Sequence, residues 1–456
     1  MTRSRFFLAA VMSVALSPLG AQTATSSADT AKVQQRTLTI QYLRPQDQRG
    51  INVFETPKVA GAEYKGFALQ FGAAFAQQFQ GLTHQNSADS VFQAAVPAVP
   101  GNAGTASVAN KNRLMAISNG FNNATANMYM HAQLARGVRI QLTSYLSARH
   151  HNETWVKDGF IQIDESPIDI GLLNTIMKYT TVKIGHFEVN YGDFHFKRSD
   201  NGQALYNPLV GNAILDAFTT EVGAEAIVQH NGLLGVFALT NGEIRGNITR
   251  PADRSPAVMA KLGFDRQLND DVRVRLTGSW RNQGSAISNT LYAGDRAGSR
   301  YYYVLENYQA TESAQQYSGN INPGFSDKSS SYMINPFVKV RGLELFGMVE
   351  KAKGRAAPNT NPVREVNQYM GEATYRFLQN EKLFVAARWN QVSGDLGGLN
   401  NDVKVTRGNA GAGWFIAPSL LLKAEVVNQT YNGFVRTDIR NGGKFKGFML
   451  EAVTAF

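Results

Sequence analysis

The chain has 456 residues, a formal net charge of +10 at pH 7 and no cysteine, and it is rich in glycine (42), phenylalanine (26) and tyrosine (17). The missing cysteines exclude disulfides, thiol catalysis and thiolate metal sites. No stretch beyond the N-terminus approaches the roughly 18 consecutive apolar residues of a membrane-spanning helix, which excludes a helical membrane protein.

The first 21 residues have the pattern of a secretory signal peptide. Arg3 and Arg5 supply a positive start, residues 6–16 are apolar, and small residues lead up to Ala21. We therefore predict that the chain is exported and that residues 1–21 are a signal peptide. Residues 22–65 are expected to form a flexible or irregular N-terminal extension. An exported chain with this positive charge should favour anionic lipids or solutes.

Alternation of apolar and polar residues begins at residue 66. Phe67, Leu69, Phe71, Phe75 and Phe79 share one parity of residues 66–80, and mostly alanine, glycine and glutamine occupy the other. A period of two is typical of a β-strand with two different faces. About 15 residues is far longer than the five or six of an ordinary strand.

The same alternation recurs along the rest of the chain. It is clear at 126–134, 138–145, 258–265, 272–280, 332–340, 369–377, 383–390 and 420–426. It is weaker at about 155–165, 180–191, 217–230, 232–241, 299–308, 342–352, 402–416 and 446–456. Short turns such as 341–342 and 379–380 alternate with long polar loops such as 281–298 and 432–445. These segments predict about 16 or 17 antiparallel strands.

Long strands with short turns at one end and long loops at the other predict an outer-membrane barrel. The predicted fold class is all-β, a transmembrane antiparallel β-barrel of about 16 strands (roughly 16–18) over residues 66–456. A sheet in hydrocarbon must close on itself, because lipid offers its backbone no hydrogen bonds. The alternative is a secreted soluble sandwich or propeller, whose strands are rarely longer than about 10 residues. The final strand ends at Phe456 and resembles the signal read by the bacterial barrel-assembly machinery.

Most strand charges fall on the parity opposite the apolar residues. A charge facing lipid near the bilayer midplane costs about 2–4 kcal/mol, so this parity should face the lumen. The basic members are Arg139, Lys261, Arg273, Arg275, Lys339, Arg376, Arg388 and Lys423, against the acidic Asp265, Glu372 and Glu425. We predict a pore wall that attracts anions. The alternative is that these bases pair with carboxylates and brace the barrel.

The segment 193–216 is a long loop without a strand pattern, and such loops are usually functional. Folded into the tube, it would narrow the pore and place His195, Lys197 and Arg198 near the constriction. The alternative is an ordinary extracellular loop.

Residues 183–192, with the sequence KIGHFEVNYG, resemble the basic-apolar-Gly-x-Phe-x-Val-Pro-Phe-Gly segment of phosphate-selective porins. Asn190 replaces the usual proline, and Tyr191 replaces the phenylalanine. The resemblance covers about residues 60–240 and implies a 16-stranded porin, often trimeric, that conducts anions through a constricted basic channel. The arginine ladder of that family cannot be traced here, so phosphate specificity does not follow.

Motifs for enzyme chemistry are missing: there is no G-x-S-x-G, H-E-x-x-H or G-x-x-x-x-G-K-[ST]. His150 and His151 point to opposite faces of any strand, and no carboxylate cluster accompanies His186 and His195, so these are read as surface or interfacial histidines. A barrel hydrolase with a Ser/His pair is the enzyme alternative. We expect no catalytic residue, metal or cofactor.

The function predicted from the sequence is an outer-membrane porin for passive diffusion of small anionic solutes such as phosphate. Its expected partners are membrane lipids, small anions, the assembly machinery and, from the resemblance, two further copies in a homotrimer, with no nucleic acid. The competing hypothesis is a plugged or closed barrel that serves as a structural, adhesion or receptor protein. A lumen filled by residues 22–65 would favour that second hypothesis.

Overall fold

The computed structural model describes residues 40–56, 58, 63–93, 109–147, 154–246, 248–293, 302–310, 319–398 and 400–456. The predicted signal peptide 1–21, residues 22–39, and His150 and His151 lie outside the described residues. All of the described residues belong to one compact unit, Leu38–Phe456. Among the described residues, no helix is both long and apolar enough to cross a bilayer.

Sixteen long strands make up almost all of the regular structure. They are β1 (Ala68–Gln85), β5 (Thr125–Ala135), β6 (Val138–Leu146), β7 (Trp155–Ile163), β8 (Thr180–Glu188), β9 (Thr220–His230), β10 (Leu233–Thr240), β11 (Ala257–Gln267), β12 (Val272–Gln283), β13 (Lys328–Val340), β14 (Leu343–Arg355), β15 (Arg364–Phe377), β16 (Leu383–Gly394), β17 (Val403–Ala417), β18 (Leu420–Asn432) and β19 (Lys444–Ala455). The shorter elements are β2 (Phe92–Gln93), β3 (Ala109–Asn110), β4 (Gly120–Phe121), the helix α1 (Gly171–Met177) and four single-turn 3-10 helices.

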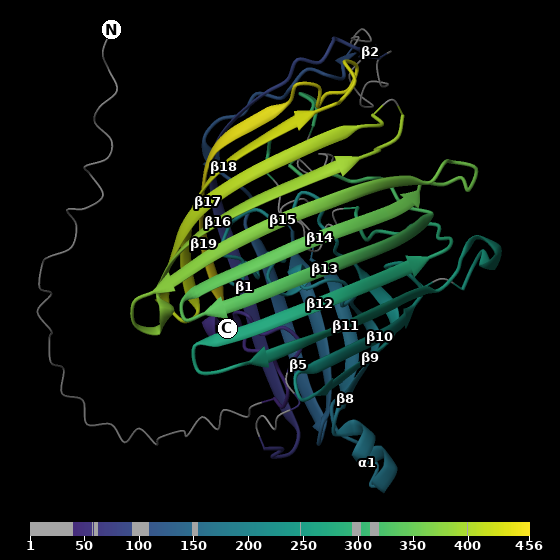
Figure 1. Ribbon diagram of the computed structural model, residues 1–456, viewed down its shortest axis with the longest axis vertical. Coiled ribbons are helices and arrows are strands. Elements are labelled where there is room, and N and C mark those ends of the chain that lie inside the picture. The colour runs from purple at the N-terminus through teal and green to yellow at the C-terminus, as the bar shows by residue number, and fades with distance from the viewer. Residues whose placement is uncertain are drawn as a thin grey trace, which may run out of the picture. The chain divides into compact units, whose positions relative to one another are not determined.

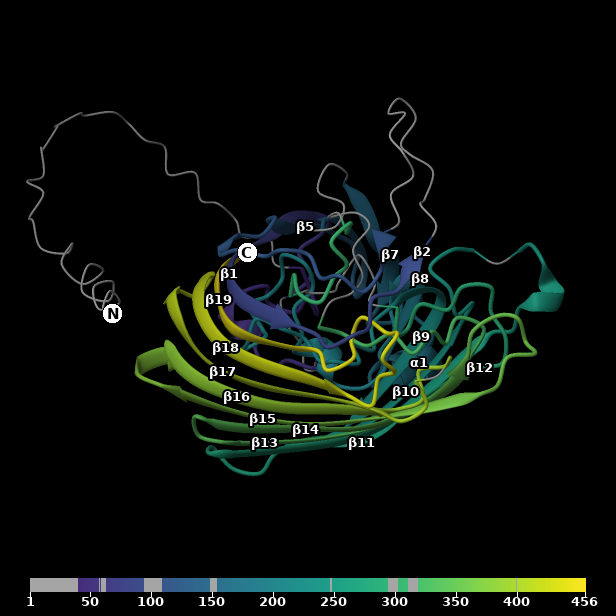
Figure 2. The same cartoon turned by 90° about the horizontal axis from the view of Figure 1, so that it is seen from above.

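The long strands form one closed antiparallel sheet. Each strand from β5 onward pairs with the next in the chain, and β1 pairs with β5 on one side and with β19 on the other. The seam between first and last strands runs to the end of the chain, where Ala73 and Phe456 exchange two backbone hydrogen bonds of 3.0 Å. The fold is therefore a 16-stranded transmembrane β-barrel, as the sequence predicts (Figures 1 and 2).

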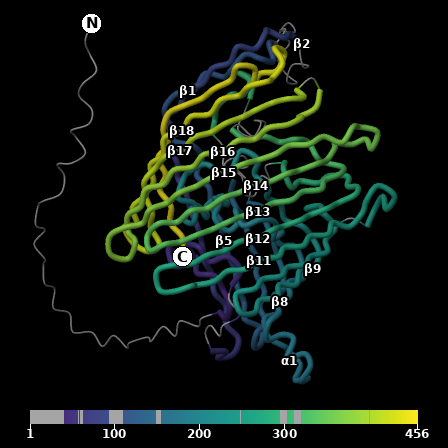
Figure 3. The backbone as a smooth tube through the Cα atoms, in the orientation of Figure 1, coloured from purple at the N-terminus to yellow at the C-terminus, as the bar shows by residue number. Residues whose placement is uncertain are grey.

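The connections between strands differ in length at the two ends of the barrel, and the backbone trace in Figure 3 lets the reader follow them. At one end the turns are residues 136–137, 231–232, 268–271, 341–342, 378–382 and 418–419, together with the α1 segment 164–179. Asn231 and Gly232 both have positive φ, 48° and 77°, the two-residue turn that suits twisted hairpins. The other end carries the longest connections, including 189–219 and 284–327. We call these the short-turn end and the long-loop end.

Side chains alternate between the outside and the inside of the barrel along nearly every strand. In β18, Leu422, Val426 and their parity are exposed, while Lys423, Val427 and their parity are buried. The outward parity carries most of the large exposed apolar side chains, such as Phe71, Phe237 and Tyr332. An apolar exterior and a satisfied backbone are what a sheet in lipid requires.

Sixteen of the 17 segments predicted from alternation are strands, and residues 299–308 are the exception. Its described part, 302–308, is not a long strand, because its apolar side chains turn inward: Tyr302 and Val304 are 1% and 0% exposed. The hydroxyl of Tyr302 donates to Glu425 on β18 at 2.6 Å. The segment follows an apolar alternation because it enters the barrel interior, not because it joins the wall.

The inner face is less uniformly polar than a water-filled tube would need. Met333, Phe337, Phe346, Met348 and Met449 all point inward and are at most 3% exposed. They pack in one cluster with apolar residues of the connection 189–219, such as Val210 and Leu215. This barrel therefore encloses a packed core of its own.

The two-sided pattern makes a stability prediction on β18. Val426→Arg places a charge in the middle of the lipid-facing strand and should cost about 2–4 kcal/mol in free energy of unfolding. Thr430→Arg on the same parity lies nearer the rim and should cost about 0–1 kcal/mol. Denaturant titrations of the protein in phospholipid vesicles measure both values, and equal costs would contradict the assigned lipid face.

Candidate functional site: the barrel interior

Residues 40–56 run across the short-turn end, and we call them the strap. The strap starts at β5 and β6, where the backbone N–H of Gln41 donates to the side chain of Gln133 at 2.9 Å. It then reaches the turn between β17 and β18, where the Gln48 N–H donates to the carbonyl of Pro418 at 2.9 Å. The side chain of Gln48 also donates to the carbonyl of Asn380 at 2.8 Å. The strap therefore crosses part of the mouth, from β5 to the turns between β17 and β18 and between β15 and β16.

The strap returns through the interior along β14, β13 and β12. Asn52 donates to Glu344 at 2.6 Å, and Arg273 donates to the carbonyl of Asn52 at 3.0 Å. Phe54 is 3% exposed and packs edge-on against Phe337, with ring centroids 5.4 Å apart. These contacts anchor the strap by polar and apolar interactions at once.

The connection between β8 and β9, residues 189–219, folds into the barrel, and we call it the inner loop. Gly192, with φ of +70°, permits the turn inward, and a Cβ there would meet the sulfur of Met333 at 2.2 Å. The loop crosses to β15, β16 and β18, where the N–H groups of Leu215, Ile214 and Val210 donate to Gln368 (3.0 Å), Asn390 (2.6 Å) and Glu425 (2.8 Å).

Three inward-facing bases hold the carbonyl groups of the inner loop. Lys423 donates to the carbonyls of Ala204, Asn207 and Leu209 at 2.8, 3.1 and 3.0 Å. Arg388 donates to the carbonyl of Gly211 at 2.7 Å, and Arg407 donates to that of Asn212 at 2.6 Å. Buried carbonyls need such partners, so these bases replace the water that the loop would otherwise require.

A four-residue charge cluster ties the inner loop and the strap to β11 and β12. Asp193 of the loop accepts from Arg275 at 2.8 and 2.9 Å and contacts Lys261 at 3.1 Å. Glu55 of the strap lies 2.7 Å from Arg275 and 3.4 Å from Lys261. Burial alone would raise the pKa of Asp193 and of Glu55, but the two cations outweigh it and hold both pKa values below their usual range.

All eight predicted wall bases point into the barrel, and each has a carboxylate partner. The pairs are Arg139 with Asp164, Lys261 with Glu55 and Asp193, Arg273 with Asp265, Arg275 with Glu55, Asp193 and Asp265, Lys339 with Glu344 and Glu381, Arg376 with Glu344, Arg388 with Glu372, and Lys423 with Glu451. Only the side chains of Arg273 and Lys339 remain as much as 26% exposed. The wall bases therefore have the arrangement expected from the alternative in which they pair with carboxylates and brace the barrel.

Of the three predicted constriction residues, Lys197 and Arg198 are buried inside the barrel and His195 is partly buried there. His195 hydrogen-bonds Glu188 at 3.0 Å and Asn190 at 2.9 Å. Lys197 lies 3.4 Å from Glu372, and Arg198 makes a two-pronged contact with Asp216 at 2.9 and 2.5 Å. The inner loop thus lies within the tube, but these side chains fix its conformation and are engaged with carboxylates or amides.

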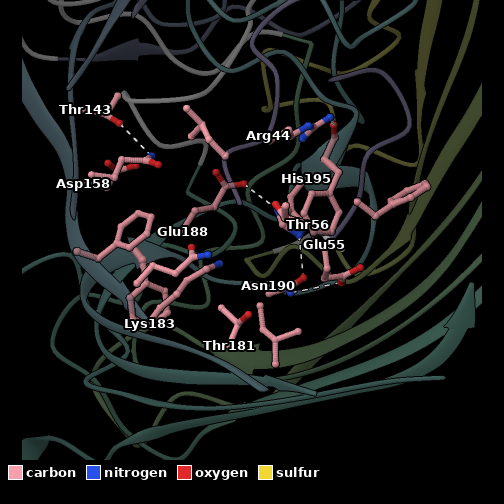
Figure 4. A pocket seen from close by; sticks show the side chains of 18 of the residues that line it. Arg44, Glu55, Thr56, Thr143, Asp158, Thr181, Lys183, Glu188, Asn190 and His195 are labelled. Carbon is pink, nitrogen blue, oxygen red and sulfur yellow. Dashed lines mark hydrogen bonds and ion pairs between the residues drawn. The ribbon is translucent and has the colours of Figure 1, made fainter. Parts of the chain in front are cut away.

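A polar cavity of about 230 Å³ remains between the strap, the inner loop and the wall of β5 to β9 (Figure 4). Its basic lining residues are Arg44, Arg139, Lys157 and Lys183, and its acidic lining residues are Glu55, Asp158, Glu188 and Asp200. Lys157 contacts both Asp200 and Glu188, and Lys183 lies 3.0 Å from Glu225. The equal numbers of bases and acids give this cavity no surplus of either sign.

Sequence reasoning missed several residues that organise the interior. Arg281 and Arg407 are buried lumen bases, the first paired with Glu221, but one lies at the start of a predicted loop and the other in a segment without clean phase. Glu55 belongs to the extension that was expected to be irregular. Within the described residues, no three His, Asp or Glu side chains are grouped as a metal site would need.

Comparison with known proteins gives structural likeness alone. No protein-family model matches the chain, and no curated protein matches it. Similar solved structures include an anion-selective porin from Comamonas acidovorans (9% identity, TM-score 0.48, covering 86% of this chain and 100% of that one). The outer membrane channel DcaP of Acinetobacter baumannii is also similar (9%, 0.48, 87% and 99%). At this identity and TM-score, neither assigns an activity to this chain.

The charge cluster makes a stability prediction. Asp193→Asn leaves Lys261 and Arg275 with one carboxylate fewer in a buried site and should cost about 3–5 kcal/mol in free energy of unfolding. Glu365→Gln, which removes a partly exposed carboxylate on the outer rim, should cost far less. Denaturant titration compares the two, and a loss for Asp193→Asn no larger than for the control would contradict the role of the cluster.

The lowered pKa of Asp193 also predicts a pH dependence. A carboxylate with a depressed folded pKa stabilises the protein above its unfolded pKa, about 3.9, and this stabilisation is lost as the pH falls through the folded value. The wild-type free energy of unfolding should therefore fall as the pH drops below about 4, and fall less steeply in Asp193→Asn. Parallel slopes in the two proteins would count against the paired state of Asp193.

Proposed function

We propose that this protein is an outer-membrane porin, a narrow channel for passive diffusion of small solutes. The observation that carries the proposal is the closed 16-stranded barrel with a polar cavity, lined by charged side chains, left open beside β5 to β9. Solutes would pass between this wall and the two inner segments. No catalytic group or cofactor enters the mechanism, which is diffusion down a gradient.

The proposed route to the membrane begins with export by the signal peptide 1–21. The strand β19, which ends beside Phe456, would then be read by the barrel-assembly machinery. The long-loop end would face the outside of the cell, as in other outer-membrane barrels. Support for a homotrimer comes from the resemblance of residues 183–192 to phosphate-selective porins and from the outer surface of β5 to β10, on which no Asp, Glu, Lys or Arg is exposed.

We propose small anions, phosphate among them, as the preferred solutes, with a weak preference. The preference is supported by the positive net charge, +10 for the whole sequence and 10 − 2 = +8 without Arg3 and Arg5 of the signal peptide, and by the partly exposed lumen bases Arg273 and Lys339. The balanced charges of the cavity and the paired wall bases argue against a strong electrostatic filter. Charged linings select ions by the charge that remains after pairing.

The second candidate is a plugged barrel with a structural, adhesion or receptor role. The strap favours this candidate, because it crosses the short-turn mouth and is anchored to β5, β12 and β14 as well as to two turns. The two candidates differ in whether solute passes through the barrel with the strap in place.

Recording of ion currents in planar lipid bilayers separates the two candidates. The wild-type protein should show small unitary conductance, and deletion of residues 40–56 should raise it, because the strap occupies one mouth. Phe54→Ala is a milder variant that should raise it less, and Phe121→Ala, on an exposed side chain, is the matched control. A folded wild-type barrel without conductance would exclude the porin and favour the plugged barrel.

Reversal potentials in a salt gradient test the solute preference. The permeability ratio should favour chloride over potassium slightly, and Lys339→Gln should move the ratio toward one, since that base is partly exposed to the lumen. Lys178→Gln, next to α1, is the control and should leave the ratio unchanged. A preference for potassium in the wild-type protein would overturn the proposed anion channel.

A further inference from the structure

Five lysines gather on the outside of the barrel at the long-loop end. They are Lys351 and Lys353 on β14, Lys404 on β17, and Lys444 and Lys446 on β19, and we call them the lysine rim. All five belong to the outward parity and are exposed. Among the outward residues of β13 to β19, Glu365 on β15 is the only carboxylate, and it is shared by Lys351 (2.6 Å) and Lys353 (3.2 Å).

The rest of the lysine rim has no acidic partner within the part of the chain that the structure describes. Lys444 and Lys446 stand opposite Thr430 and Asn428 of β18, and Lys404 stands opposite Asn432 of the same strand. The lysines are therefore surrounded by hydroxyl and amide groups, which can also bind an oxyanion. The strands that carry them belong to one continuous stretch of the barrel wall, β14 to β19, in which β15 and β16 separate β14 from β17 and β18 separates β17 from β19 (Figure 1).

Aromatic side chains lie next to the lysine rim, toward the middle of the barrel wall. Tyr332, Tyr369 and Trp389 are outward-facing on β13, β15 and β16 and are 54%, 43% and 47% exposed. Tyrosine and tryptophan collect at the level of lipid headgroups. The rim lysines stand farther along their strands toward the long loops, at or beyond that level, where a lipid-side charge is tolerated.

The opposite wall of the barrel lacks this feature. The exposed side chains of β5 to β10 include large apolar residues such as Met128, Ile184 and Phe237, and no Asp, Glu, Lys or Arg is among them. The lysine rim is therefore confined to one side of the barrel and is not a general property of its long-loop end. It serves no contact inside the barrel, because all of its members point away from the lumen.

We propose that the lysine rim binds the phosphate groups of a phosphorylated lipid in the leaflet at the long-loop end. In the outer membrane proposed above, that lipid is the phosphorylated glycolipid of the outer leaflet. Ammonium groups above an aromatic belt match acyl chains capped by phosphate in both polarity and charge. The proposal rests on the proposed membrane and orientation, but not on conductance.

Binding of bisphosphorylated lipid A to the purified full-length protein tests the proposal, with native mass spectrometry or fluorescence titration as the readout. Lys404→Gln/Lys444→Gln/Lys446→Gln should weaken binding roughly 100-fold, since each lysine near an anionic headgroup contributes about a factor of five. Lipid A without its phosphates should bind the wild-type protein as weakly as the intact lipid binds this variant.

The matched control is Lys65→Gln/Lys178→Gln/Lys382→Gln, which removes three lysines toward the short-turn end and should leave lipid A binding unchanged. Lys404→Arg/Lys444→Arg/Lys446→Arg keeps the charge and should retain binding. The folded state of each variant is checked by its heat-dependent migration in gel electrophoresis. If the triple glutamine variant does not fold, each single variant should show about a fivefold loss. Wild-type affinity in the rim variant, equal loss in the control, or full displacement of the lipid by an equal concentration of inorganic phosphate would overturn the proposal.

Discussion

The interior of this barrel depends on the pairing of buried cations with carboxylates and with backbone carbonyls of the inner loop. An unpaired charge inside a protein is strongly destabilising, and so is a buried carbonyl without a donor. Lys423 and Arg388 meet both needs, since each contacts a carboxylate of the wall and carbonyls of the loop. Removing such a base would leave a buried carboxylate of the wall without that cation and would also remove hydrogen bonds to carbonyls of the inner loop.

The same pairing sets what the lumen can do as a pathway. Bases that neutralise Glu55 and Asp193 are not available to attract a solute from outside. The positive net charge of the sequence is therefore not matched by a surplus of basic residues in the lining of the cavity. The apolar residues between them, such as Phe337 and Met348, are covered by the strap and the inner loop and add burial of the kind found in soluble cores. The space that remains is small and electrically balanced.

Local pattern predicts the wall of this protein well, and its interior less well. A lipid face and a lumen face impose a period of two on every strand, so 16 strands and the orientation of residues such as Arg275 and Arg376 follow from the sequence. The partners of those residues do not, because Glu55 and Arg275 are 220 positions apart and nothing in either neighbourhood indicates the other. The prediction of a strand at residues 299–308 was wrong for a related reason. An apolar segment that fills a barrel has much the same composition as one that forms its wall.

The path of the strap has a consequence for the order of assembly. Residues 40–56 precede every strand of the barrel, yet Gln48 contacts the turn between β17 and β18 and the turn between β15 and β16. These binding partners do not exist together until β15 to β18 have paired. Synthesis therefore delivers the strap first, but its native contacts with these turns can be completed only after β18 has paired with β17 near the end of the chain.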